Sequence, residues 1–336
     1  MAALADGLID VHTHVCPLNL PGSPSPTITQ WPCMCPRSPT EAAIEIAGKT
    51  FRELDDRSWS ATRRIEDMDR DGVAVQVLSP MPELLSYWFD GAAAELIADH
   101  MNGTLAAMIA HDPRRFCGLG MVPMQDVPRA VKAMERLRER FGLDGIEIGS
   151  HIDHVMLGDR RFDPIWEAAE SLGLAILIHP LHPLTAKLEG VSPLLHPLVG
   201  FLNEGAIAGG SLLMAGVLDR YPQLRIGLTH GGGGLVPVIA RLDQGWHTMP
   251  PFRSTLERLP SEQAQSLFFD TNVYDARYLA YLAKVVAPDR LFVGTDYPYQ
   301  IMQADPAAYV AIADLTPAER ISVRQGAARR FLGVSD

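Results

Sequence analysis

Short apolar segments alternate with amphipathic segments along most of the chain. The apolar segments have the length of buried strands, and the stretches between them, such as 127–142, place apolar residues at helical spacing. The helix predicted over 161–173 ends at a glycine, which is a common helix stop. The pattern predicts eight strands, over residues 8–14, 73–80, 116–124, 145–150, 174–180, 224–232, 266–272 and 290–298.

Strands that alternate with helices in this way predict an α/β fold, a (β/α)8 TIM barrel, built as a single domain over residues 1–336. An open, doubly wound sheet is the alternative, but no glycine-rich dinucleotide-binding motif follows the first strand. The segment of about 16–58 is rich in Pro and Ser and interrupts the alternation. We interpret it as a small insertion after the first strand, where long loops lie at the catalytic face of a barrel.

The composition is that of an ordinary globular enzyme, with 47% hydrophobic and 21% charged residues. A formal net charge of -11 argues against a nucleic-acid-binding protein, although a few arginines can still bind an anionic substrate. We see no signal peptide and no apolar run of membrane-spanning length, so we expect no membrane partner and a cytoplasmic location. The cysteines form no disulfide or zinc-ribbon pattern and are predicted to be free thiols: Cys16, Cys33, Cys35 and Cys117.

Several histidines follow the predicted strands at their carboxyl ends. His12 and His14 lie two residues apart at the end of the first strand, so both project to the same face. His179, His230 and Asp296 end the fifth, sixth and eighth strands. Because strand ends converge on one site in a barrel, these side chains should meet. Three histidines and a carboxylate suit a divalent ion such as zinc, and a fourth histidine remains for acid–base chemistry.

Four motifs carry a family resemblance: "DVHTH", "IHP", "THGGGG" and "GTDYP", in this order, resemble the amidohydrolase superfamily. The chain is further similar to the 2-amino-3-carboxymuconate-6-semialdehyde decarboxylase-like family. The similarity spans nearly the whole chain and is weakest in the insertion. Its most similar stretches are 64–88, 118–126, 145–151 and 229–246.

The resemblance implies one zinc ion, held by four ligands, with His230 beside it as the catalytic acid–base group. Manganese is the alternative ion, and no organic cofactor is required. We interpret the glycines after His230 as leaving backbone room for a substrate. The implied metal ligands are His12, His14, His179 and Asp296, of which Asp296 also serves catalysis.

The resemblance also implies arginines that bind a small-molecule carboxylate substrate. Arg52 is the first, and Lys49 is a weaker candidate for the same role. Arg241 would come from the neighbouring subunit of a homodimer. The alternative for Arg241 is an ordinary surface arginine paired with Asp243 or another surface carboxylate, since such pairs are common.

These features favour a metal-dependent, non-oxidative decarboxylase of a carboxymuconate-semialdehyde-like acid or a related acid from aromatic catabolism. A hydroxybenzoate-type decarboxylase, a metal-dependent hydrolase and a catalytically inactive binding protein are the alternatives. The fourth predicted strand carries Glu147 and no lysine that could bridge a second metal ion. The family has a Trp-Asp pair after "IHP", where this chain has Leu181 and His182, so the substrate-facing part of this loop differs.

Overall fold

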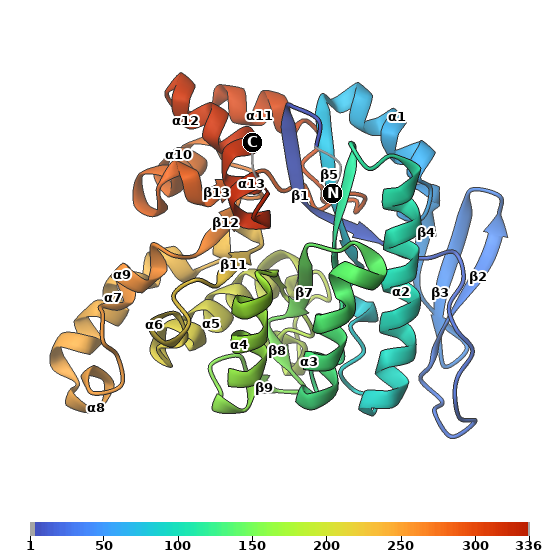
Figure 1. The fold of residues 1–336 in the computed structure, drawn as a ribbon, viewed down its shortest axis with the longest axis horizontal. Coiled ribbons are helices and arrows are strands. Elements are labelled where there is room, and N and C mark those ends of the chain that lie inside the picture. The colour runs from blue at the N-terminus through green and yellow to red at the C-terminus, as the bar shows by residue number, and fades with distance from the viewer. Residues whose placement is uncertain (1–3, 335–336) are drawn as a thin grey trace.

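The main feature of the structure, a computed structural model that describes residues 4–334, is a nearly closed barrel of parallel strands (Figure 1). All eight predicted strands are confirmed, although the third and the last three are clearly shorter than predicted. Within the described residues, the order of the strands around the barrel is β1 (Leu8–Val15), β5 (Val73–Pro80), β6 (Phe116–Gly120), β7 (Gly145–Gly149), β10 (Ala175–His179), β11 (Arg225–Leu228), β12 (Phe268–Asp270) and β13 (Leu291–Phe292).

The barrel closes between its first strand and the segment that follows its last strand. The Val11 amide donates to the Val293 carbonyl at 2.8 Å, and the Asp296 amide donates to the His12 carbonyl at 2.9 Å. The second of these bonds places the backbone of Asp296 directly beside the histidine pair on β1. The predicted (β/α)8 barrel is therefore confirmed.

Helices cover the outside of the barrel and connect its strands. The first, α1 (Ala61–Asp71), begins after Ser60, whose side chain accepts from the Arg63 amide, and ends at Gly72 with φ 68°. No helix in 4–334 combines the length and hydropathy that a membrane crossing needs. The other helices are α2 (Gly91–His111), α3 (Val127–Arg136), α4 (Asp163–Leu172), α5 (Phe201–Met214), α6 (Val217–Arg220), α7 (Leu235–Thr248), α8 (Pro250–Arg253), α9 (Pro260–Ala264), α10 (Ala276–Val286), α11 (Pro306–Ile312), α12 (Pro317–Ile321) and α13 (Ala327–Leu332).

The inside of the barrel is apolar below the histidines. The β1–β5 pairing shifts register between Asp10 and Thr13, the stretch of β1 that contains Val11 and His12. Burial of such an apolar layer stabilises the fold and fixes the strands whose ends form the site. The layer consists of strand residues and residues of α13: Ile9, Val11, Val75, Val77, Leu119, Leu177, Phe268, Phe292, Phe331 and Leu332.

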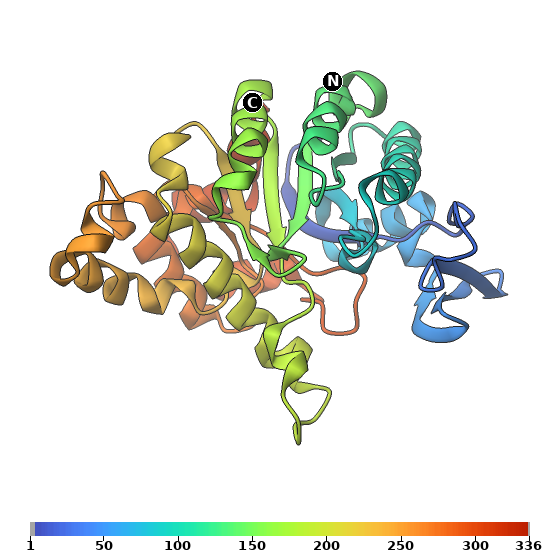
Figure 2. The same ribbon diagram turned by 90° about the horizontal axis from the view of Figure 1, so that it is seen from below.

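The predicted insertion contains a three-stranded antiparallel sheet, β2 (Pro32–Ser38), β3 (Glu41–Ile46) and β4 (Lys49–Asp55). Its Met34 thioether lies 3.7 Å from the Cys16 thiol at the end of β1. Figures 1 and 2 show this sheet on one side of the barrel and the α7–α8 region on the opposite side. The treatment of the whole chain as one domain, with an insertion of about 16–58, stays a prediction.

Candidate metal centre

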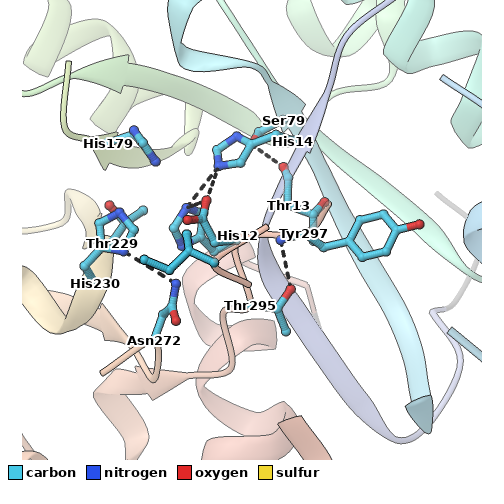
Figure 3. Close-up of polar contacts among 12 residues, drawn as sticks. His12, Thr13, His14, Ser79, His179, Thr229, His230, Asn272, Thr295 and Tyr297 are labelled. Carbon is cyan, nitrogen blue, oxygen red and sulfur yellow. Dashed lines mark hydrogen bonds and ion pairs between the residues drawn. The ribbon is translucent and has the colours of Figure 1, made fainter. Parts of the chain in front are cut away.

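Four predicted ligands meet at the carboxyl end of the barrel, and their ligand atoms all lie within 4.8 Å of one another. The Nε2 atom of His14 lies 3.1 Å from Nε2 of His12 and 3.0 Å from Oδ1 of Asp296, and His179 points toward this group (Figure 3). A tetrahedral site with bonds of about 2.0–2.1 Å has ligand atoms about 3.3 Å apart. The spacing in this cluster therefore matches what a divalent ion requires.

The outer ring nitrogens of the three histidines are already engaged. Nδ1 of His12 lies 2.7 Å from Oδ2 of Asp270, Nδ1 of His14 lies 3.1 Å from the Pro80 carbonyl, and Nδ1 of His179 lies 2.8 Å from the Pro180 carbonyl. Each of these acceptors requires a proton on Nδ1, so each Nε2 keeps a lone pair that faces the centre. Nε2 of His179 is buried and has no partner among the described residues. The residues fit a divalent metal ion.

Burial and mutual contacts set the charge state of the cluster. Burial raises the pKa of Asp296, but the hydrogen bond to His14 and the nearby imidazoles outweigh it, so the pKa is lowered and the carboxylate stays ionised. Burial lowers the pKa of His179 well below its usual range, and the adjacent His14 and His12 lower it further. Burial also lowers the pKa of His14, but Asp296 and Glu147 raise it above its usual value. A cation at the centre would oppose that protonation, because it repels a proton on the same nitrogens.

Asp270 belongs to the site and was missed by sequence reasoning. It is fully buried at the end of β12, and its Oδ1 accepts from the amides of Gly231 and Asn272 while Oδ2 faces His12. His12 and the adjacent His230 hold the pKa of this carboxyl below its usual value, although burial acts in the opposite direction. Asp270 thus orients one candidate ligand and the turn that carries His230. The available signal in the sequence was its position at the end of a buried strand.

Replacing Asp270 by alanine should weaken metal binding by about 10–100-fold, because His12 loses the acceptor that fixes its ring. Competition with a chromogenic chelator measures the affinity, and circular dichroism checks the fold. Asp270→Asn is the matched variant, since it keeps an acceptor for the Gly231 and Asn272 amides. Unchanged affinity in a folded alanine variant would show that Asp270 does not support the metal centre.

His230 lies beside the cluster, with its ring centroid 5.0 Å from that of His12 and 5.4 Å from that of His179. Its Nδ1 lies 3.5 Å from the side-chain amide nitrogen of Asn272, and its buried Nε2 has no partner in 4–334. Burial lowers the pKa of His230, with Asp296 acting in the opposite direction. A neutral imidazole with one free nitrogen can exchange a proton with a bound molecule.

The backbone around His230 is unusual for residues that are not glycine. His230 has φ 54° and Asp296 has φ 68°, both in the left-handed region that strains most side chains. The glycines after His230 serve packing: a Cβ at Gly233 would lie 2.0 Å from the Leu202 carbonyl oxygen, and one at Gly231 would lie 2.4 Å from Val273. We therefore attribute these glycines to close packing within the protein, and not to space for a substrate.

Arg52 reaches the mouth of the cluster from β4. Its guanidinium is 2.5 Å from Glu83 and lies over the Tyr299 ring at 4.6 Å from the centroid. The Tyr299 ring in turn stacks on His14, with centroids 4.9 Å apart. About a third of the Arg52 side chain stays exposed, at 34%. The structure therefore brings the first predicted arginine to the candidate metal centre.

The other two predicted substrate-binding residues lie elsewhere. Lys49 is exposed at the start of β4, and its side chain forms no hydrogen bond or ion pair with residues 4–334. Arg241 is exposed on α7 and likewise has no polar partner in the described part of its own chain. Asp243, its suggested surface partner, instead accepts from the Ser261 amide at 3.0 Å. The pairing of Arg241 with Asp243, the alternative to a substrate-binding role, is not formed.

A cleft of about 390 Å³ opens at the same end of the barrel. Glu83, which contacts Arg52, lines this cleft. Leu181 and His182, which lie after β10, line it as well. His182 packs against Trp88, with ring centroids 4.9 Å apart. The loop at which this chain departs from the family pattern is therefore a wall of the cleft.

Comparison with known proteins agrees with this geometry. The family model described as amidohydrolase matches residues 9–334. The 2-amino-3-carboxymuconate-6-semialdehyde decarboxylase of Dictyostelium discoideum is 31% identical over 329 residues, which cover 97% of this chain and 91% of the relative.

Solved structures show the same architecture. The 5-carboxyvanillate decarboxylase of Sphingomonas paucimobilis has a TM-score of 0.76 and 28% identity, over 83% of this chain and 85% of that chain. The 5-carboxyvanillate decarboxylase of Novosphingobium aromaticivorans, complexed with manganese and 4-hydroxy-3-methoxy-5-nitrobenzoic acid, has a TM-score of 0.72 and 25% identity, over 83% and 82%. With its sequence match, barrel and histidine cluster, the chain belongs to the amidohydrolase superfamily, within the 2-amino-3-carboxymuconate-6-semialdehyde decarboxylase-like family.

Proposed function

We propose that this protein is a metal-dependent, non-oxidative decarboxylase of a conjugated acid of the carboxymuconate-semialdehyde type. The convergence of His12, His14, His179 and Asp296 on one point carries the proposal. The position of Arg52 beside this cluster supports the proposal, as do the decarboxylases to which the chain is similar. The four converging residues are proposed as the metal ligands.

Loss of CO2 breaks a carbon–carbon bond and leaves its electron pair on the substrate. The substrate must therefore carry a conjugated carbonyl or imine that accepts the electrons, and a proton must reach the carbon afterwards. A divalent ion held by the four ligands would polarise a substrate oxygen and lower the pKa of water. His230, with its free Nε2, is proposed to hold and move the proton.

Arg52 is proposed to position the substrate carboxylate. A guanidinium binds a carboxylate through two parallel hydrogen bonds, which fixes orientation as well as charge. The contacts of Arg52 with Glu83 and Tyr299 hold it in place before the substrate arrives. Lys49 remains a weaker proposal, because it is exposed and has no contact that aims it at the site.

Zinc is proposed as the ion, because three imidazoles and one carboxylate suit it. Manganese is the alternative, supported by the manganese in the carboxyvanillate decarboxylase of Novosphingobium aromaticivorans. Metal analysis of purified protein distinguishes the two ions.

The choice between an open-chain and a ring substrate can be tested directly. Purified protein would be assayed for CO2 release from carboxymuconate semialdehydes and from hydroxybenzoates. We expect faster release from the open-chain acids, because 31% identity over 97% of the chain links it to an enzyme named for such a substrate. Faster CO2 release from a hydroxybenzoate would instead identify the substrate as a ring acid. A hydrolytic product without CO2 would contradict the proposal.

A homodimer is proposed, in which Arg241 enters the site of the partner subunit. Arg241 is the seventh residue of α7, the helix that follows the His230 turn, and α7 lies on the opposite side of the barrel from the insertion (Figure 1). Exposed apolar side chains lie on α7, on α5, which packs against it, and on the preceding segment around 185–200, which projects from the barrel in Figure 2. Surfaces of this kind commonly mark interfaces. These side chains are Leu188, Leu194, Leu198, Val199, Leu202, Ile207, Met214 and Val238.

Mixing two inactive variants tests the shared site. In a hybrid dimer of an Arg241→Ala chain and a His230→Ala chain, one site keeps both His230 and the partner's Arg241. Random exchange of subunits should therefore restore about a quarter of wild-type turnover, since half of the dimers are hybrids with one intact site each. Native mass spectrometry confirms that hybrids form. Hybrids that form and stay inactive would show that Arg241 does not act across the interface.

A further inference from the structure

A second cluster of metal-binding groups lies on the insertion, outside the candidate metal centre. Cys33 and Cys35 are two residues apart on β2, so their side chains project to the same face. Their Sγ atoms are 3.8 Å apart. Cys33 pairs with Glu45 of β3 across the sheet, and the ligand atoms of all three residues lie within 4.8 Å of one another.

The distance between the two sulfurs suits a shared ion. Thiolates that bind zinc at about 2.3 Å in a tetrahedral arrangement are about 3.8 Å apart. Both cysteines are free, and Cys33 is exposed while Cys35 is partly exposed, so an ion can reach them. The other two cysteines, Cys16 and Cys117, are buried. Among the cysteines of the described chain, the accessible thiols are thus those of this one pair.

The charges around the pair also favour a divalent cation. Arg37 contacts Oε1 of Glu45 at 2.8 Å, so the cluster holds one guanidinium, one carboxylate and two thiols, while Glu53 on β4 also acts on Arg37. Two thiolates and the carboxylate carry three negative charges, which one divalent cation together with Arg37 would neutralise. Without a cation, partial burial and the neighbouring Cys33 and Glu45 raise the pKa of Cys35 to about 11. Binding would therefore release protons, as it does at other thiolate sites.

We propose that Cys33, Cys35 and Glu45 form a second metal site, on the outer face of the insertion, for a thiophilic divalent cation such as zinc. This site is separate from the catalytic one. Cys33 and Glu45 are cross-strand partners, whereas Arg52 pairs with Ile44 and projects to the other face of the sheet, toward Tyr299. A bound ion would join β2 to β3 and so stiffen the sheet that presents Arg52 to the substrate.

Titration of the metal-loaded enzyme with Cd²⁺, under a phosphine reductant, tests this site. The ultraviolet charge-transfer band of a cadmium–thiolate bond reports sulfur ligands, so histidine and aspartate ligands of the catalytic centre give no signal. We expect a band with the intensity of two thiolates per chain, which Zn²⁺ displaces. The band should fall by at least half in Cys33→Ser and in Cys35→Ser and disappear in the double variant.

Two acidic variants complete the test. Glu45→Gln should weaken Cd²⁺ binding by about tenfold, the loss that corresponds to one charged contact. Glu53→Gln, an exposed carboxylate on the neighbouring β4, should leave the binding unchanged. The proposal fails if reduced wild-type protein gives no band, or if the band survives in the double cysteine variant. Equal effects of Glu45→Gln and Glu53→Gln would remove Glu45 from the site.

Discussion

Replacing His12 or Asp296 by alanine is expected to abolish both metal binding and CO2 release. Each change removes one of four converging ligand atoms and so leaves the ion with an incomplete set of protein ligands. Nε2 of His12, Nε2 of His14 and Oδ1 of Asp296 lie 3.0–3.4 Å apart, so the loss of either side chain opens a vacancy in this group. Metal analysis and a CO2 assay on the same sample measure both losses.

The control for this experiment is His111→Ala, an exposed histidine at the end of α2. It removes an imidazole without touching the cluster and should keep both metal and turnover. Thermal unfolding of each variant shows whether the protein is still folded. Full activity in a His12→Ala or Asp296→Ala protein without bound metal would refute the metal centre as the site of reaction.

Replacing His230 by alanine is expected to reduce turnover by at least about a hundredfold, the usual contribution of a general acid or base, while the metal stays bound. The three other histidines and Asp296 supply the proposed ligands, and His230 keeps a buried nitrogen free beside them. The decisive readout is turnover per bound metal ion.

The backbone at His230 calls for a second variant. Because its φ is 54°, alanine there adds strain that is unrelated to proton transfer. Asn tolerates left-handed conformations better, so His230→Asn should fold as the wild type does and still be inactive. Loss of the metal in both variants would make His230 a ligand instead. Normal turnover in folded His230→Asn would exclude a proton-transfer role.

The barrel was predictable because its strands are short, apolar and separated by helical segments. The same alternation placed His12, His14, His179, His230 and Asp296 at strand ends, where a barrel brings them together. Their approach to one point needed no information beyond the order of strands and helices.

Other parts of the site depend on contacts that periodicity does not encode. Asp270 is the last residue of a strand of three residues, and only the folded barrel shows that it faces His12. The contact between Arg52 and Tyr299 joins residues that are far apart in the sequence. The proposed role of Arg241 involves a second chain, so the sequence of one chain suggests it only through family resemblance.

The most direct test of the account measures CO2 release as metal is returned to metal-free protein. With the best substrate of the panel, the rate should be negligible at the start, rise in proportion to bound Zn²⁺ or Mn²⁺, and level off at about one catalytic ion per chain. The Cys33→Ser/Cys35→Ser variant should be used, so that the proposed site on the insertion does not add to the count. CO2 release at the full rate before any metal is added would contradict the central claim.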